Sequence, residues 1–118
     1  MSDTSRYNGY ERLLSHRRNV TMKWAAVIEY IADTSKVAEI RPHHRVYLTG
    51  LLEAGKLVCA GPFLDDFGAL IVYEAESMEL AEEMIRNDPF NIAGVFLKWT
   101  VRPWKTVFGN PLLLPPNG

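Results

Sequence analysis

The chain has 118 residues, of which 47% are hydrophobic and 23% are charged, and its formal net charge is -1. A chain of this length forms one domain and can bury a core. The near-neutral charge excludes the basic surface that binds nucleic acid or an anionic membrane.

The N-terminal residues 1–21 are polar and basic, unlike the rest of the chain. They lack the apolar core of a secretory signal peptide. We expect this extension to contain a short amphipathic helix that docks on the domain or on a second subunit. The spacing of Tyr10, Leu13, Leu14 and Arg17 fits such a helix.

Residues 23–30 (KWAAVIEY) are rich in apolar and aromatic side chains, which predicts a strand. Residues 34–40 follow as a connector or a short helical turn. Proline suits the first position of a helix, so we expect the first main helix to open at Arg41 and Pro42. Gly55 is expected to end this helix as the glycine after its last turn.

Residues 56–62 (KLVCAGP) and 69–75 (ALIVYEA) predict two strands, joined by a hairpin turn at residues 65–68. The near-continuous apolar run of the second strand predicts burial on both faces. Ser77 is a typical cap for a second helix, which runs to about residue 87. Asp88 ends that helix because the residue before proline disfavours helical geometry.

Residues 91–94 are expected to form a loop, and residues 95–102 (VFLKWTVR) alternate as a half-buried strand. Pro103 is expected to end the regular pairing. We therefore predict a domain over residues 22–109 and an extended, proline-rich tail over residues 110–118.

The element order β-α-β-β-α-β is the ferredoxin-like arrangement of an α+β protein. Two helices would cover one face of a four-stranded antiparallel sheet. The strands also carry large apolar residues, namely Trp24, Phe96 and Trp99, which we expect on both faces. Because large exposed apolar patches are rare on monomers, a homodimer with the two sheets face to face is predicted.

Two polar residues lie on the apolar stripes of the predicted helices. His44 begins a stripe with the spacing i, i+3, i+4, i+7, i+8, and Asp88 extends a second stripe by one turn. Burying an unpaired imidazole or carboxylate is costly. The pattern therefore indicates either a satisfied structural pair or a functional site.

Six short motifs give the chain a family resemblance. It resembles the YciI-like (YCII-related) family of the dimeric α+β barrel group, which also contains muconolactone isomerases, and the likeness spans about residues 23–109. The motifs are RPHHRVYL at 41–48, AGKL at 54–57, AGP at 60–62, DPF at 88–90, AGVF at 93–96 and VRPW at 101–104.

The resemblance implies a small, cofactor-free protein with a His–Asp pair in a pocket beside the sheet. That pair carries over to His44 and Asp88, with a proposed role in acid–base chemistry. One branch of the family resembles a dehydrochlorinase that acts on a chlorinated aromatic breakdown product. Most members have no established reaction, so the substrate is not implied.

Each site residue also has a purely structural interpretation. His44 could be a core histidine, and Asp88 could accept backbone N–H groups in a local turn. In the functional interpretation, Asp88 accepts the imidazole N–H, and the other nitrogen faces a substrate. His43 is expected to face solvent.

Four further residues are candidates for substrate binding, with alternatives of their own. Arg41 is expected either to bind a substrate carboxylate or to be solvated. Tyr47 would donate a hydrogen bond in the pocket or pack in the core. Gly61 and Pro62 would let the backbone approach a ligand, although turn geometry also explains them.

No metal and no cofactor are implied by the sequence. The predicted pair supplies two potential metal ligands, whereas a catalytic zinc needs three. Cys59, the single cysteine, excludes an internal disulfide and is expected to be a buried, inert thiol in a cytoplasmic protein. No apolar run is long enough to cross a bilayer.

Three functions remain open from the sequence. The first is an enzyme that uses His44 and Asp88 for isomerisation or elimination on a small ring, enol-like or aromatic-breakdown substrate. The second is a module that binds or senses a small anionic ligand without turnover. The third is a structural protein in which the pair only satisfies its own hydrogen bonds.

Overall fold

A four-stranded antiparallel sheet forms one layer of the fold, as seen in a computed structural model that describes residues 20–116. The strand order is β2-β3-β1-β4, and all neighbouring strands are antiparallel. The strands are β1 (Met22–Tyr30), β2 (Leu57–Pro62), β3 (Gly68–Ala75) and β4 (Phe96–Trp104).

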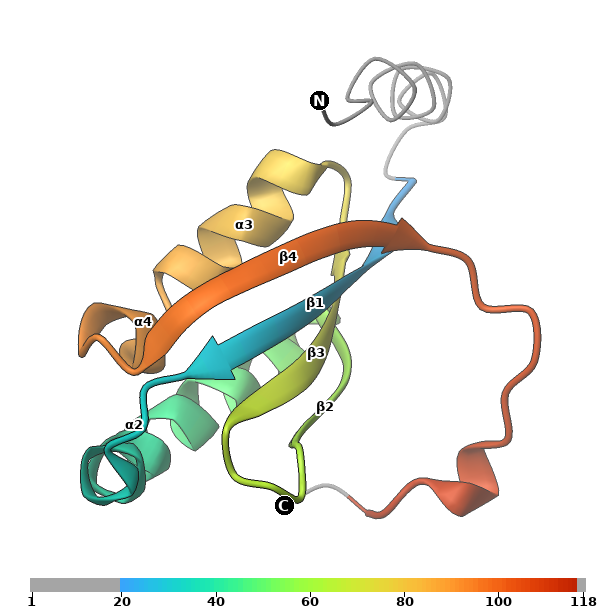
Figure 1. Cartoon of the computed structure of the whole chain (residues 1–118). Helices are drawn as coiled ribbons and strands as arrows, with labels where there is room; N and C mark the ends of the chain where they lie inside the picture. The colour runs from blue at the N-terminus through green and yellow to red at the C-terminus, as the bar shows by residue number, and fades with distance from the viewer. Residues whose placement is uncertain (1–19, 117–118) are drawn as a thin grey trace.

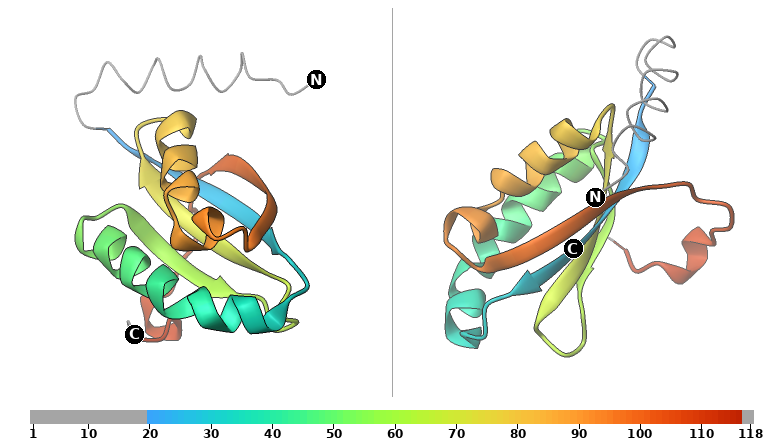
Figure 2. Two further views of the ribbon diagram at one scale, coloured as in Figure 1. Left: turned by 90° about the vertical axis from the view of Figure 1, so that its left-hand side faces the viewer. Right: turned by 45° about the horizontal axis from the view of Figure 1, so that its top comes forward.

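The helices form a second layer on one face of this sheet (Figures 1 and 2). They are α2 (Thr34–Glu53), α3 (Met78–Arg86) and the short α4 (Pro89–Ile92). A single turn of 3-10 helix, η1 (Pro111–Leu113), follows β4 in the C-terminal segment. The predicted α+β class, the ferredoxin-like order and the placement of the helices are confirmed. The predicted N-terminal helix lies outside the described residues.

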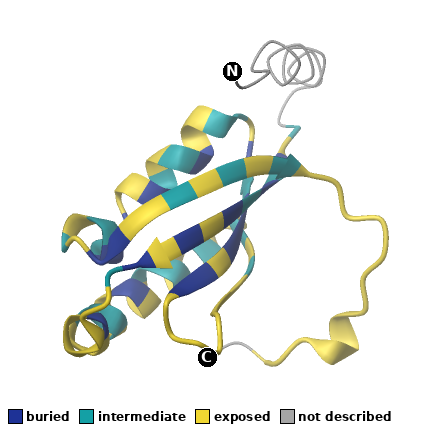
Figure 3. Cartoon of the chain, viewed as in Figure 1, coloured by how far each residue is buried: buried dark blue, intermediate teal, exposed yellow. Residues whose placement is uncertain are grey.

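The core lies between the two layers, where alternate strand residues point. In β1 the side chains of Trp24, Ala26 and Ile28 are fully buried, while the intervening residues are more exposed (Figure 3). Opposite them on β3, Ile71 and Tyr73 complete the same face. The period of two along each strand therefore builds the core face of the sheet.

Helix α2 begins earlier than the sequence indicated. Its N-cap is Asp33, whose side chain accepts the Lys36 N–H, and the helix then runs through Pro42 without a break. The prediction of a connector at residues 34–40 and of Pro42 at the first helical position was wrong. Val37 and His44 are buried seven residues apart on one helix face, so packing keeps the first turns helical although Pro42 lacks an N–H donor.

Two further boundaries differ from the prediction. Residues 91–94 are not simply a loop, because α4 occupies Pro89–Ile92. Pairing of β4 also continues past the expected stop, since Pro103 lies opposite Trp24. This is possible because β4 is an edge strand, and a proline there removes no hydrogen bond within the sheet.

The face of the sheet that carries no helix, called the open face below, is apolar but not for the predicted reason. Trp24, Phe96 and Trp99 all lie on the helix side, packed in or against the core. The open face instead exposes other large side chains: Val27 is 47% exposed, Leu70 39% and Trp104 45%.

The prediction that β3 is buried on both faces holds only in part. Val72 is 1% exposed, whereas Leu70, two residues earlier on the same face, is partly exposed. The burial of β3 is therefore complete only on the helix side.

Candidate functional site

Asp88 occupies the junction between α3 and α4. It adopts extended backbone angles, φ -66° and ψ 132°, as expected before a proline, and it is the N-cap of α4. Its Oδ1 accepts the N–H of Phe90 at 2.8 Å. The local-turn interpretation of Asp88 is therefore correct as a description of its geometry.

The same carboxylate also contacts His44 on α2. His44 Nδ1 lies 2.8 Å from Asp88 Oδ1 and 2.9 Å from Oδ2. Asp88 is fully buried and His44 is 7% exposed. Because an ionised carboxylate only accepts hydrogen bonds, Nδ1 carries the hydrogen and donates it. The two polar residues of the apolar stripes thus meet.

Aromatic rings fix the orientation of the His44 imidazole. The ring stacks on Phe90 with centroids 4.1 Å apart and an interplanar angle of 17°. The Phe96 ring packs against the imidazole in a T-shaped arrangement, with the two ring centroids 6.3 Å apart. With Nδ1 held by Asp88, the second nitrogen, Nε2, makes no hydrogen bond to the residues that the structure describes. Nε2 is therefore the atom of the pair that can exchange a proton with a ligand.

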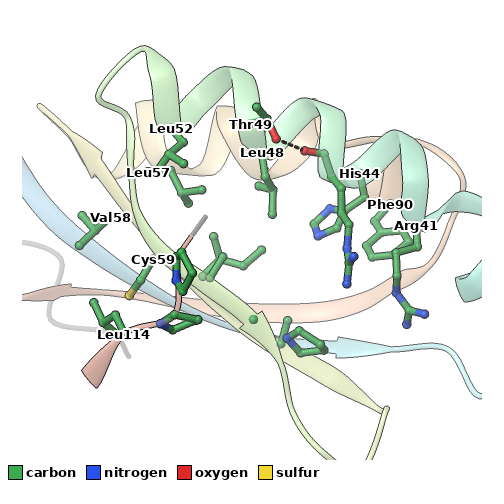
Figure 4. A pocket seen from close by; sticks show the side chains of 18 of the residues that line it. Arg41, His44, Leu48, Thr49, Leu52, Leu57, Val58, Cys59, Phe90 and Leu114 are labelled. Carbon is green, nitrogen blue, oxygen red and sulfur yellow. Dashed lines mark hydrogen bonds between the residues drawn. The ribbon is translucent and has the colours of Figure 1, made fainter. Parts of the chain in front are cut away.

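A cavity of about 580 Å³ lies beside this imidazole. Its walls come from one side of α2, from β2, from parts of β3 and from the C-terminal segment, and His44 and Phe90 form part of its lining (Figure 4). This volume is in the range of small-molecule sites, about 300–1,000 Å³. The His–Asp pair therefore adjoins a space that can hold a ligand.

The structure places three of the four predicted binding residues at this cavity. Arg41, Gly61 and Pro62 line it. Tyr47 is not part of the lining, and its hydroxyl donates to the backbone carbonyl of Met84 at 2.7 Å. This bond joins α2 to α3, which corresponds to the packing alternative for Tyr47.

The sequence did not single out Tyr30, which also lines the cavity. The pKa of its phenol is raised to about 12, chiefly by burial, with Arg41 lowering it in part and the nearby Asp88 charge adding to the rise. Tyr30 is thus a neutral hydrogen-bond donor at physiological pH. The available signal was its position as the last inward-facing residue of β1, at the strand end nearest α2.

A second tyrosine near the pair has an unsatisfied hydroxyl. Tyr73 is completely buried, and its hydroxyl has no hydrogen-bond partner within residues 20–116. Burial raises its pKa strongly, with a smaller contribution from the Asp88 charge. Tyr73 therefore stays protonated beside the carboxylate and adds no charge to the site.

We also looked at the described residues for a metal site, a membrane-spanning helix and a reactive thiol. Across the described part of the chain, no group of three or more His, Cys, Asp or Glu side chains is arranged to hold a metal ion. Within the same part, no helix has the length and apolar character needed to span a membrane. Cys59 is partly buried and lines the cavity, so it is not the fully buried thiol that we expected.

The fold and the site together define a class of protein: a small α+β domain with a buried His–Asp pair at a cavity between α2 and the edge of the sheet. The model of the YCII-related domain family matches residues 22–105. The chain therefore belongs to the YCII-related family.

Individual proteins support this assignment. The chain is 34% identical over 83 residues to the protein YciI of Escherichia coli, which covers 62% of this chain and 85% of YciI, and it matches YciI of Shigella flexneri equally. It is also similar to the solved structure of 5-chloro-2-hydroxyhydroquinone dehydrochlorinase (TftG) from Burkholderia phenoliruptrix AC1100 in complex with 2,5-dihydroxybenzoquinone. That likeness has a TM-score of 0.63 and 29% identity, over 71% of this chain and 94% of TftG.

Proposed function

We propose that the protein is a small enzyme in which His44 moves a proton on a ring substrate. The observation that carries the proposal is the geometry of one side chain: Nδ1 of His44 is held by the buried Asp88, and the ring lines a cavity. A carboxylate that fixes the tautomer of a histidine leaves the other nitrogen able to accept a proton. The similarity to a dehydrochlorinase favours the same class of chemistry.

The proposed step is an elimination or an isomerisation. Nε2 of His44 takes a proton from the substrate, and the electron pair left behind forms a new double bond. In an elimination that pair expels chloride from the adjacent atom. In an isomerisation His44 returns the proton at another atom of the ring system. In both, the Asp88 carboxylate stabilises the imidazolium that forms.

Two other lining residues have roles in this proposal. Tyr30, neutral at physiological pH, would donate a hydrogen bond to a substrate oxygen on which negative charge develops. Arg41 would bind an anionic group of the substrate. Together they would orient a ring against Nε2 of His44.

Matched histidine variants test the proposal. His44→Ala and Asp88→Asn would be assayed on chlorinated hydroxyhydroquinones and on enol lactones, with His43→Ala as the control because His43 is exposed on the same helix. We expect His44→Ala to lower kcat/KM about 10²–10⁴-fold, the usual contribution of a positioned acid or base. His43→Ala should match wild type. If His44→Ala retains full activity, the proposed role of the pair is wrong.

A second function is a ligand-binding module without turnover, and the cavity volume with Arg41 in its lining favours it. Calorimetric titration with aromatic acids, followed by chromatography of the recovered ligand, separates the two. Binding with unchanged ligand, together with no turnover of any substrate in the enzyme assay, would favour the module.

We also propose a homodimer formed through the open face. Val27, Leu70 and Trp104 expose apolar surface there. Val27 and Leu70 lie between the ion pairs that join Lys23 to Glu74 and Glu29 to Lys98, and Trp104 lies opposite Lys23. Light scattering after size exclusion should give twice the chain mass for wild type. Val27→Asp should give a monomer because it places a charge in the apolar centre. A wild-type monomer at micromolar concentration would refute the dimer.

A further inference from the structure

The two ends of the cavity differ in chemistry. Six residues of α2 line it (Figure 4): Arg41, His44 and Arg45, and then Leu48, Thr49 and Leu52. Leu52 is eleven positions after Arg41, which is about 16 Å at a rise of 1.5 Å per residue. The lining of α2 therefore changes along the cavity from cationic and polar to mainly aliphatic, with Thr49 between the two leucines.

Strand β2 reinforces this gradient because it runs back along α2 after the turn at Gly55. Leu57 and Val58, at its start, are near the end of α2 that carries Leu52. Pro62, at its other end, belongs to the part of the sheet nearer Arg41. Among residues 20–116, no aspartate or glutamate lines the cavity. An anion at the Arg41 end would thus meet no like charge from the wall.

The C-terminal segment after β4 adds to the aliphatic part of the wall. This arm, residues 106–116, lies beyond the YCII-related match, which ends at residue 105. It arcs away from β4 and returns toward β2 (Figures 1 and 2). Leu114, Pro115 and Pro116 line the cavity, and Figure 4 draws Leu114 on the side of Val58 and Cys59. The arm therefore supplies apolar surface from outside the family domain.

We propose that the cavity binds an amphipathic anion, with its carboxylate or phenolate at Arg41 and an aliphatic or extended aromatic body that reaches Leu114 of the arm. The proposal rests on the proposed function only in placing the ligand beside His44. It adds the substrate class: an acid with an apolar extension. The arm is the element that sets the preference for that extension.

The free energy of burying apolar groups predicts how the affinity changes with the chain length of the ligand. Burying one methylene is worth about 0.8 kcal/mol, which corresponds to about a fourfold change in dissociation constant. Affinity should therefore rise about fourfold with each carbon added to a straight-chain acid, until the aliphatic part of the cavity is filled.

The experiment is calorimetric titration of the full chain with straight-chain carboxylates from butanoate to decanoate. Leu114→Asp is compared with Leu112→Asp, which adds the same charge to the same arm. Leu114 is 59% exposed and lines the cavity, whereas Leu112 is 90% exposed and does not. We expect Leu114→Asp to weaken decanoate binding at least tenfold and Leu112→Asp to match wild type.

A second comparison tests the role of Arg41 at the anion-binding end of the cavity. Arg41→Gln should weaken octanoate binding at least tenfold and leave binding of 1-octanol unchanged. Equal affinity of wild type for all chain lengths, or equal effects of the two arm variants, would overturn the proposal. Those results would leave the proposed function standing if His44→Ala still abolished turnover of a chlorinated ring, so the two failures are distinguishable.

Discussion

Removing the Asp88 carboxylate should destabilise the fold more than any other single change at the site. Asp88 is fully buried, caps α4 through the Phe90 N–H and accepts the His44 Nδ1–H. Asp88→Ala leaves two buried donors unpaired. Breaking a buried pair by removing one partner costs about 3–5 kcal/mol.

Asp88→Asn separates the two roles of this residue. Asparagine is also a good N-cap, so the Phe90 N–H keeps an acceptor. What is lost is the charge that strengthens the bond from His44, and hydrogen bonds to charged groups contribute about 1.5–3 kcal/mol. We therefore expect the free energy of unfolding to fall in the order wild type, Asp88→Asn, Asp88→Ala.

The measurement is thermal and urea denaturation followed by circular dichroism. One kcal/mol shifts the melting temperature of a domain this small by about 4–8 °C, so Asp88→Ala should melt at least about 12 °C below wild type. A double-mutant cycle of Asp88→Asn with His44→Ala should show that the two effects are not additive, because the residues are in direct contact. Additive effects, or an Asp88→Ala protein that melts within about 2 °C of wild type, would refute the reasoning.

Three other predictions use different parts of the molecule. Gly68→Ala should lower the melting temperature strongly, because the added Cβ would overlap the carbonyl oxygen of Ile28 on the facing strand. Gly61→Ala is the control: a Cβ there meets nothing within 4 Å, so this variant should melt at the wild-type temperature. Burial raises the pKa of Tyr47 to about 12, so the folded state holds this proton more tightly than the unfolded chain. The resulting stability is present below pH 10 and is lost as the pH rises toward 12, and melts at pH 8 to 11 should show a smaller alkaline loss for Tyr47→Phe than for wild type. Tyr30→Phe removes a hydroxyl with no partner among the described residues, so kcat/KM should fall at least tenfold while the melting temperature changes little; equal activity would remove Tyr30 from the proposed mechanism.

Helical spacing in the sequence was sufficient to predict that His44 and Asp88 point inward. Their meeting depended on strand order, which the sequence also predicted through its alternation of strand and helix patterns. Predictions of element boundaries were wrong where a tertiary contact overrode a local sequence preference. Pro42 is a helix-starting residue in isolation, but the burial of Val37 extends α2 through it.

The lining of the cavity was harder to predict because it is assembled from distant segments. Tyr30 has an ordinary place in a strand pattern, and only the packing of α2 over β1 and β3 makes it part of a site. Leu114 belongs to a proline-rich tail with no periodicity to interpret. Trp24 and Trp99 show the opposite error, since their size indicated a dimer face although both point into the domain.

The double duty of Asp88 affects how this site is interpreted in related sequences. Since one carboxylate caps α4 and orients His44, selection for a stable fold alone would retain both residues after an activity had been lost. The presence of both residues in a relative therefore indicates a conserved fold as much as a conserved reaction. Arg41 lines the cavity and makes no such structural bond to the residues that the structure describes, so it is free to change once a ligand no longer matters. Its variation among relatives is therefore the more informative marker of a working site.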